Sequence, residues 1–227
     1  MSGRKRSNSN IKLTALQKEQ IQTLQTIYNQ ADTLVKEVED FIGEAGIPAL
    51  NEMRYAGYHL AHSILVEDCK FCDSQITSAI NHCKRACYEA SEAGIVVALL
   101  KFKEFREDYK SVVVSEVVQE WQQIQKDFEK SQKDINEGRA RGDEDRSTDY
   151  QGRMQVFRLV KDHCETTDCA RDDLNAKIHE DTKSGRRFVI TTLIAGLAIL
   201  VTLVFGLLGI QKNKQETTTP AAHSTTK

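Results

Sequence analysis

Proline is scarce in this sequence. The 227 residues include two, Pro48 and Pro220, and glycine is sparse before residue 188. Because proline and glycine mark the turns between short strands, this scarcity argues against an all-β fold. Charge of one sign is lacking too, since 31 basic and 33 acidic residues give a net charge of -2. No strong overall field therefore draws the chain to nucleic acid or acidic lipid.

Recognisable catalytic motifs are also missing. The sequence has no Gly-rich phosphate-binding loop with Lys and Ser, no nucleophile elbow of the GxSxG type and no HExxH motif. We therefore expect a binding and assembly protein rather than an enzyme, and we predict no cofactor.

A long uncharged run near the C-terminus is the strongest feature that is present. Residues 188–210 read FVITTLIAGLAILVTLVFGLLGI. A bilayer core needs about 20 apolar residues in helical form, and a single span must be helical because its backbone has to pair internally. We predict one transmembrane helix over 188–210, so membrane lipid is an expected partner.

The charges beside this run predict its orientation. Four basic residues precede it, and two follow it. They are Lys177, Lys183, Arg186 and Arg187 before the run, and Lys212 and Lys214 after it. Because positive charge favours the cytoplasmic side, we place the N-terminal body in the cytoplasm of a single-pass membrane protein.

The body reads as helical because its apolar residues recur mostly every three or four positions. Four helices are predicted, over 14–42, 48–67, 73–90 and 93–135, and they form a bundle over 14–135. Gly43 and Gly46 end the first helix, and Pro48 suits the start of the second.

The fourth predicted helix is the longest. At 1.5 Å per residue it would extend for roughly 60 Å, more than a compact bundle of this size. We therefore expect part of it to project, either into a coiled coil with another chain or towards the membrane. The β-branched residues at 112–114 disfavour a helix slightly, but the spacing of the apolar positions keeps the helical phase.

The remaining segments are polar. Residues 1–13 are predicted to be a disordered basic N-terminus, in which Arg4, Lys5, Arg6 and Lys12 are candidate contacts for anions or nucleic acid. A loop is predicted over 136–149, a juxtamembrane helix over 150–185 and a disordered tail over 211–227.

Six cysteines raise the question of a metal site. They are Cys69, Cys72, Cys83, Cys87, Cys164 and Cys169. The two close pairs offer zinc ligands together with His59, His62 or His82. However, they lie in helical sequence rather than in Gly-rich knuckles, and free cysteine is commonly a buried apolar residue. We predict reduced thiols and no metal.

Six residues recur within the predicted span at steps of three and four, and five of them are small or weakly polar. The six are Thr192, Ala195, Ile199, Thr202, Gly206 and Gly209. This spacing is the heptad seam of packed helices, and membrane helices associate through such residues. We predict a homo-oligomer, and with four or more copies this face is a candidate pore lining with an apolar gate near Ile199.

One polar constellation keeps an enzymatic alternative open. Arg54 and His59 have an Arg-x4-His spacing, and His82 and Arg85 are three apart in the next helix. If the two helices form a hairpin, these four residues and Glu52 converge. The motif resembles that of the HEPN-type ribonucleases, which are helical and cleave RNA without metal. The resemblance implies that His59 is the acid or base and that Arg54 stabilises phosphoryl charge; the alternative is a buried polar network that fixes helix register.

The layout of a helical body above one span resembles small bacterial membrane effectors of antiphage defence. In such effectors a cytoplasmic sensor domain controls a membrane-disrupting or channel-forming span, which implies a bacterial inner membrane here. A cytoplasmic protein or a nucleotide-type regulator would then supply the signal. A passive membrane scaffold for a cytoplasmic partner is the remaining alternative.

Overall fold

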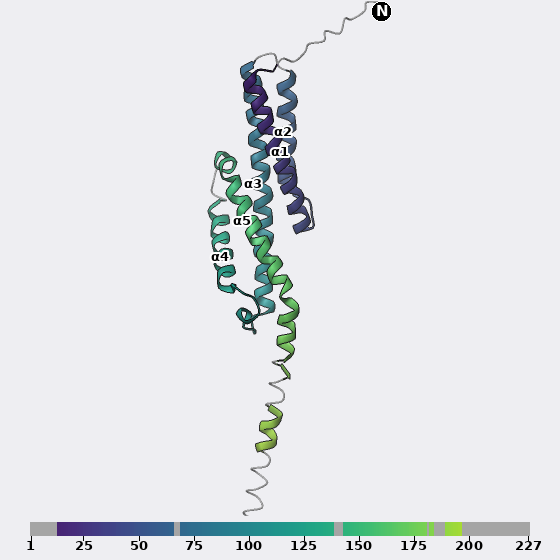
Figure 1. The fold of residues 1–227 in the computed structure, drawn as a ribbon, viewed down its shortest axis with the longest axis vertical. Helices are drawn as coiled ribbons and strands as arrows, with labels where there is room; N and C mark the ends of the chain where they lie inside the picture. The colour runs from purple at the N-terminus through teal and green to yellow at the C-terminus, as the bar shows by residue number, and fades with distance from the viewer. Residues whose placement is uncertain (1–12, 66–68, 139–142, 181, 184–188, 197–227) are drawn as a thin grey trace, which may run out of the picture. The chain divides into compact units, whose positions relative to one another are not determined.

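The computed structural model describes residues 13–65, 69–138, 143–180, 182–183 and 189–196 (Figure 1). Within these ranges all regular structure is helical and no strand occurs, which confirms the predicted all-α fold. The elements are α1 (Ala15–Ile42), α2 (Ile47–Leu65), α3 (Cys69–Asp108), the 3-10 helix η1 (Val114–Glu116), α4 (Trp121–Gly138) and α5 (Asp143–Cys169). The chain divides into two compact units, Met1–Arg171 and Asp172–Lys227.

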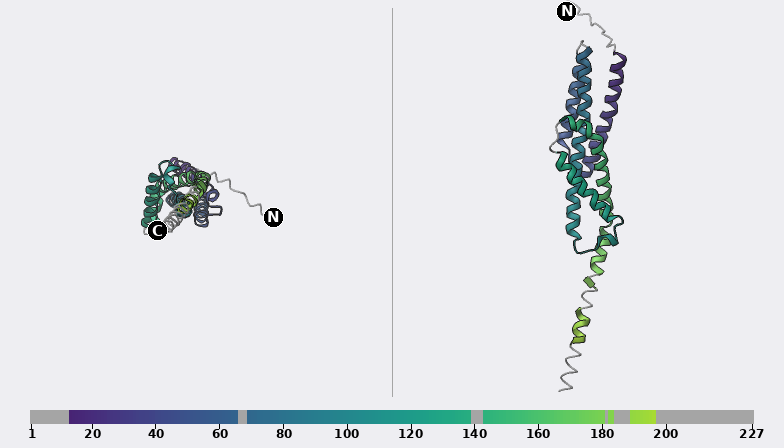
Figure 2. Two further views of the ribbon diagram at one scale, coloured as in Figure 1. Left: turned by 90° about the horizontal axis from the view of Figure 1, so that it is seen from below. Right: turned by 90° about the vertical axis from the view of Figure 1, so that its left-hand side faces the viewer.

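The 40-residue helix α3 is the centre of the first unit. Helices α1, α2 and α5 each pack along it, whereas α1 and α2 meet only sparsely. Helix α4 turns back beside α3 (Figures 1 and 2). The buried residues of α3 include Ile76, Ala79, Cys83, Ala86, Cys87, Ile95, Ala98 and Phe105. The apolar core therefore follows α3 rather than gathering at one point.

The ends of α1 are set by local hydrogen bonds. Thr14 Oγ1 accepts a hydrogen bond from the backbone N–H of Gln17 (3.2 Å), and Gln17 Oε1 accepts one from that of Thr14 (3.0 Å). This capping box satisfies two donors that a helix N-terminus leaves without partners. At the other end Gly43 has a left-handed φ of 86°, which glycine adopts without strain. The predicted helix 14–42 is confirmed. The second helix begins at Ile47 and is described as far as Leu65, and residues 66–67 of its predicted range lie outside the described residues.

The prediction of separate helices over 73–90 and 93–135 is wrong. Helix α3 continues through residues 91–94 and ends at Asp108, and α4 begins only at Trp121. Gly94 lies inside α3, and a Cβ at this position would overlap the ring of Phe157 on α5. The glycine therefore permits close helix packing rather than a helix break.

The break falls instead where the β-branched residues 112–114 disfavour helix. The chain turns there through η1, buries Val114 and Val118, and reaches α4 through Glu120, which has a positive φ of 57°. Helix α4 then runs back along α3, so the predicted projecting helix is wrong as well.

The predicted loop 136–149 is mostly helical in the described residues. Helix α4 continues to Gly138, and α5 begins at Asp143. An ion pair between Arg146 Nη1 and Glu89 Oε1, 2.7 Å apart, holds the start of α5 on α3. The predicted helix 150–185 therefore begins too late, and it is interrupted by a turn at Ala170.

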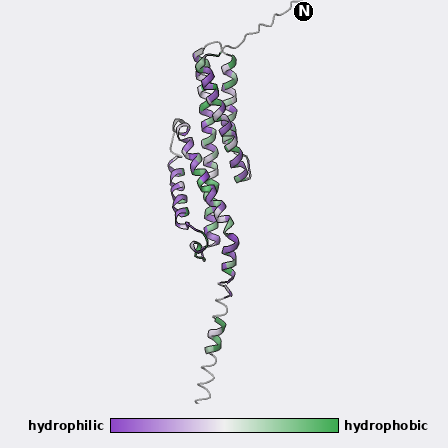
Figure 3. Ribbon diagram, in the orientation of Figure 1, coloured by the Kyte–Doolittle hydropathy of each residue, from purple (hydrophilic) through white to green (hydrophobic). Residues whose placement is uncertain are grey.

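The second unit is described only in part. Residues 172–180, 182–183 and 189–196 are helical, and 189–196 are mainly apolar (Figure 3). Across the described ranges, no helix combines the length and the hydrophobicity that a membrane crossing requires. Most of the predicted span 188–210 lies outside those ranges, as do residues 1–12 and the tail 211–227.

Candidate functional site

A polar cluster joins the middle of α2 to α3. Glu52 Oε2 lies 2.7 Å from Nδ1 of His82 and 3.2 Å from Nε of Arg85. Nη2 of Arg85 is also 2.8 Å from Nδ1 of His82. The side chains of Glu52 and Arg85 are 22% exposed and that of His82 is 14% exposed, so solvent reaches the cluster. The expected convergence of Glu52, His82 and Arg85 is therefore present.

His59 lies beside this cluster. Its ring is stacked on that of His82, with centroids 5.0 Å apart and planes 19° apart. Nδ1 of His59 is 2.7 Å from Oε1 of Gln75. Because an amide oxygen only accepts, Nδ1–H of His59 is the donor in this contact. The contact orients the imidazole beside His82.

Arg54 does not join the other four residues. Its guanidinium lies 5.6 Å from the ring centroid of Tyr55, and the residue is exposed. Among the described residues, no hydrogen bond or ion pair links Arg54 to His59. Arg85 rather than Arg54 therefore supplies the cation next to the imidazoles.

The cluster is chemically suited to proton transfer beside an anion. It combines two imidazoles, one carboxylate and one guanidinium, which are the groups used for general acid–base catalysis and for stabilising negative charge. The same contacts also satisfy polar groups between two packed helices, which is the role of a polar network that fixes register.

Four cysteines behave as buried apolar side chains. Desolvation by burial raises the pKa of Cys83 to about 11 and that of Cys164 to about 12. It also raises the pKa of Cys87 to about 12, with a smaller contribution from Cys83. Cys72 is buried too, whereas Cys169 is exposed. No group of three or more His, Cys, Asp or Glu side chains that could hold a metal occurs in the described part of the chain.

The other predicted site residues are mostly outside the described ranges. Of the proposed seam, the structure places Thr192 and Ala195 on the exposed helix 189–196. Ile199, Thr202, Gly206 and Gly209 are not described, and neither are Arg4, Lys5, Arg6 and Lys12.

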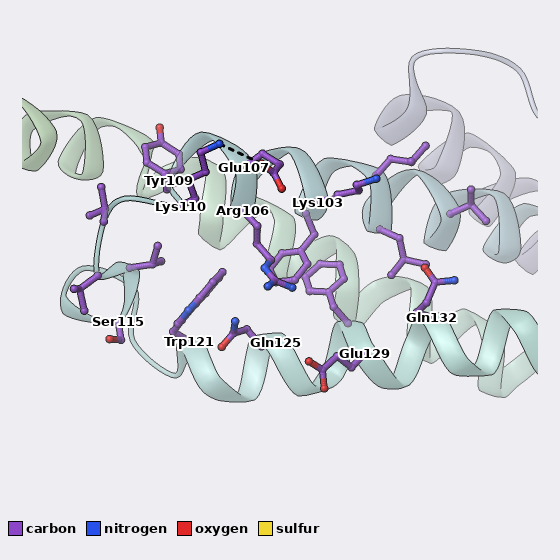
Figure 4. A pocket seen from close by; sticks show the side chains of 18 of the residues that line it. Lys103, Arg106, Glu107, Tyr109, Lys110, Ser115, Trp121, Gln125, Glu129 and Gln132 are labelled. Carbon is purple, nitrogen blue, oxygen red and sulfur yellow. Dashed lines mark ion pairs between the residues drawn. The ribbon is translucent and has the colours of Figure 1, made fainter.

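The sequence reasoning missed a groove between α3 and α4. Residues such as Arg106 and Trp121 face each other across it (Figure 4). The prediction of one straight helix over 93–135 placed these residues far apart along a single axis. The β-branched run at 112–114 was the signal that could have revealed the turn.

The chain was also compared with known proteins. No protein-family model, no curated protein and no solved structure matches it.

Proposed function

We propose that this protein is a single-pass membrane protein whose helical body faces the cytoplasm and whose spans associate. The uncharged run of residues 188–210 carries the proposal, because it is long enough to cross a bilayer as a helix. The excess of basic residues before the run supports the orientation. The described start of this segment, 189–196, is helical and exposed, as expected for a helix whose apolar surface contacts lipid or another helix.

Self-association rests on the spacing of small residues along the run. Thr192, Ala195, Thr202, Gly206 and Gly209 allow backbones to approach closely and hydroxyls to bond across a seam. We propose that clustered spans permeabilise the membrane under control of the helical body, as in an antiphage effector of a bacterial inner membrane. No charged residue lies in the run, so the expected permeability is poorly ion-selective.

Leakage from liposomes tests this function. Thr202→Leu and Gly206→Leu fill the proposed seam, and Val204→Leu is the matched control because Val204 lies off it. We expect the first two variants to reduce dye release and oligomer size, while the control behaves as the parent chain. Unchanged leakage and unchanged oligomers in both seam variants would refute the proposal. If replacing the span with an unrelated one preserves function, the protein is instead a passive scaffold for a cytoplasmic partner.

A ribonuclease activity is the second candidate, favoured by the convergence of His59, His82, Arg85 and Glu52. We propose that His59 transfers the proton and that Arg85, rather than Arg54, stabilises the phosphoryl charge. RNA cleavage by the purified full chain tests this candidate. His59→Ala and Arg85→Ala should abolish cleavage and Arg54→Ala should retain it, whereas intact RNA with the parent chain excludes the activity.

A further inference from the structure

A groove lies between α3 and α4 in the first unit. It has a volume of about 1040 Å³ and is open to solvent. Arg106 on α3 and Trp121 and Gln125 on α4 point into the space between the helices (Figure 4). The turn through η1 closes one end of the groove with Val113, Val114 and Ser115.

The base of the groove is aromatic and firmly packed. The rings of Phe102 and Phe128 are stacked, with centroids 3.9 Å apart and planes 8° apart. The Trp121 ring lies 5.5 Å from that of Phe102 and 5.8 Å from that of Phe105. Because these contacts fix the positions of the two helices, the groove is formed before any ligand binds, which lowers the entropic cost of binding.

The apolar surface of the groove is not fully covered. Leu100 and Val113 both line it, and they are 61% and 57% exposed. Large exposed apolar side chains gathered along one hollow are typical of a surface that binds a partner. An amphipathic helix bound between two helices would bury this surface.

The charges along the groove are unequal on its two sides. Lys103 and Arg106 line it from α3 and Lys110 from the turn that follows, whereas Glu107 on α3 and Glu129 on α4 are the acidic lining residues. Glu107 Oε2 lies 3.7 Å from Nζ of Lys110, so these two charges offset each other. The side chains of Lys103 and Arg106 form no ion pair or hydrogen bond with any residue that the structure describes. The α3 side therefore presents two cationic side chains that are available to a ligand.

We propose that this groove binds an amphipathic helix of a partner protein, with its apolar stripe on the aromatic base and its carboxylates facing Lys103 and Arg106. The lining runs from Val96 on α3 to Tyr109 just past its end, and from Trp121 to Ile135 on α4. Each side is therefore roughly 20 Å long, which matches about four turns of a bound helix. This length fits a helix better than a compact small molecule, whose pockets are typically enclosed.

Trp121 makes this proposal directly testable, because it is the one tryptophan of the chain. The full chain in zwitterionic nanodiscs is titrated with two synthetic helical peptides that lack tryptophan. One carries a leucine stripe with flanking glutamates, and the other carries lysines in place of the glutamates. We expect the acidic peptide to shift the Trp121 emission saturably. The basic peptide should bind at least about tenfold more weakly.

Charge-reversed variants locate the binding. With Lys103→Glu and Arg106→Glu combined, the acidic peptide should lose at least about tenfold in affinity and the basic peptide should gain. Lys130→Glu is the matched control, because Lys130 is an exposed lysine of α4 that does not line the groove. The affinity of this variant for the acidic peptide should stay within about twofold of that of the parent chain. Equal binding of both peptides, or equal loss in the control, would overturn the proposal. An emission shift that depends on protein concentration without peptide would assign the groove to a second copy and overturn it too.

Discussion

Burial changes the chemistry of single side chains in this fold. Cys83 and Cys87 lie on the core side of α3, and Cys164 lies on α5, where its thiol is 3.7 Å from the carbonyl oxygen of Ala98. The helical packing desolvates these thiols and raises their pKa values to between about 11 and about 12. The thiolate is the reactive form of cysteine, so these residues are expected to be inert at neutral pH.

Alkylation of the folded chain should therefore be selective. At pH 8, iodoacetamide is expected to label the exposed Cys169 quickly and to spare Cys83, Cys87 and Cys164. Mass spectrometry of the digested protein measures the labelling at each position. In denaturant all of them should react, which serves as the control. Labelling of Cys83 or Cys87 as fast as Cys169 in the folded chain would contradict the burial of these two thiols.

The same three thiols make stability depend on pH in the alkaline range. An unfolded thiol ionises near a pKa of about 8.5, whereas the folded thiols stay protonated up to about 11 to 12. The folded state then binds more protons, so the free energy of unfolding falls as pH rises, by up to about 2 kcal/mol per thiol between pH 8 and 10. Urea denaturation at both pH values measures this fall. It should be smaller in the double variant Cys83→Ala, Cys87→Ala, and an identical fall would show that other groups cause it.

At the scale of elements, local signals predicted α1 and α2 well and failed at α3 and α4. Thr14 and Gly43 set helix ends through contacts within a few residues, which a sequence pattern contains. The role of Gly94 is to leave room for Phe157 of α5, a contact between residues far apart in the sequence. The spacing of apolar residues also remains helical across 112–114, so it did not reveal the turn there.

The candidate sites show the same division. The spacing of Glu52, His59, His82 and Arg85 was enough to predict that they meet, because a hairpin of two helices brings such positions together. Their pairing was not predictable, since the choice of Arg85 over Arg54 depends on which helix face lies against α3. The groove depended wholly on the turn between α3 and α4, so it was missed.

Two glycines in helix interiors provide a matched test of packing between elements. Gly94→Ala should lower the free energy of unfolding by about 1–3 kcal/mol, because its methyl group overlaps the ring of Phe157. Gly57→Ala has no heavy atom within 4 Å of the added Cβ, so it should raise stability by about 0.5–1 kcal/mol through helix propensity. Thermal or urea unfolding measures both. Equal effects of the two substitutions would contradict the close approach of α5 to α3 at Gly94.

At the scale of the whole molecule, we propose separate roles for the helical body and the uncharged run. Helices α1 to α5 lie within the compact unit Met1–Arg171. The proposed function assigns attachment and self-association to 188–210 and control to the body, and the groove proposal adds partner binding to the body. The two assignments are independent, and each can fail alone.

Truncation separates the two roles. A chain that ends at Arg187 should leave the membrane fraction and keep the melting temperature of the body. A chain that ends at Ile210 loses only the polar tail and should remain membrane-bound after alkaline carbonate extraction. If the chain ending at Arg187 stays in the membrane fraction, attachment comes from the body and the proposed span is wrong.

The most direct test of the central claim is the mass of the detergent-extracted full chain, measured by light scattering and corrected for bound detergent. Clustered spans predict a discrete species of at least four 25.6 kDa chains, reduced in size by Gly206→Leu and unchanged by Val204→Leu. A species with the mass of one chain would contradict self-association of the spans.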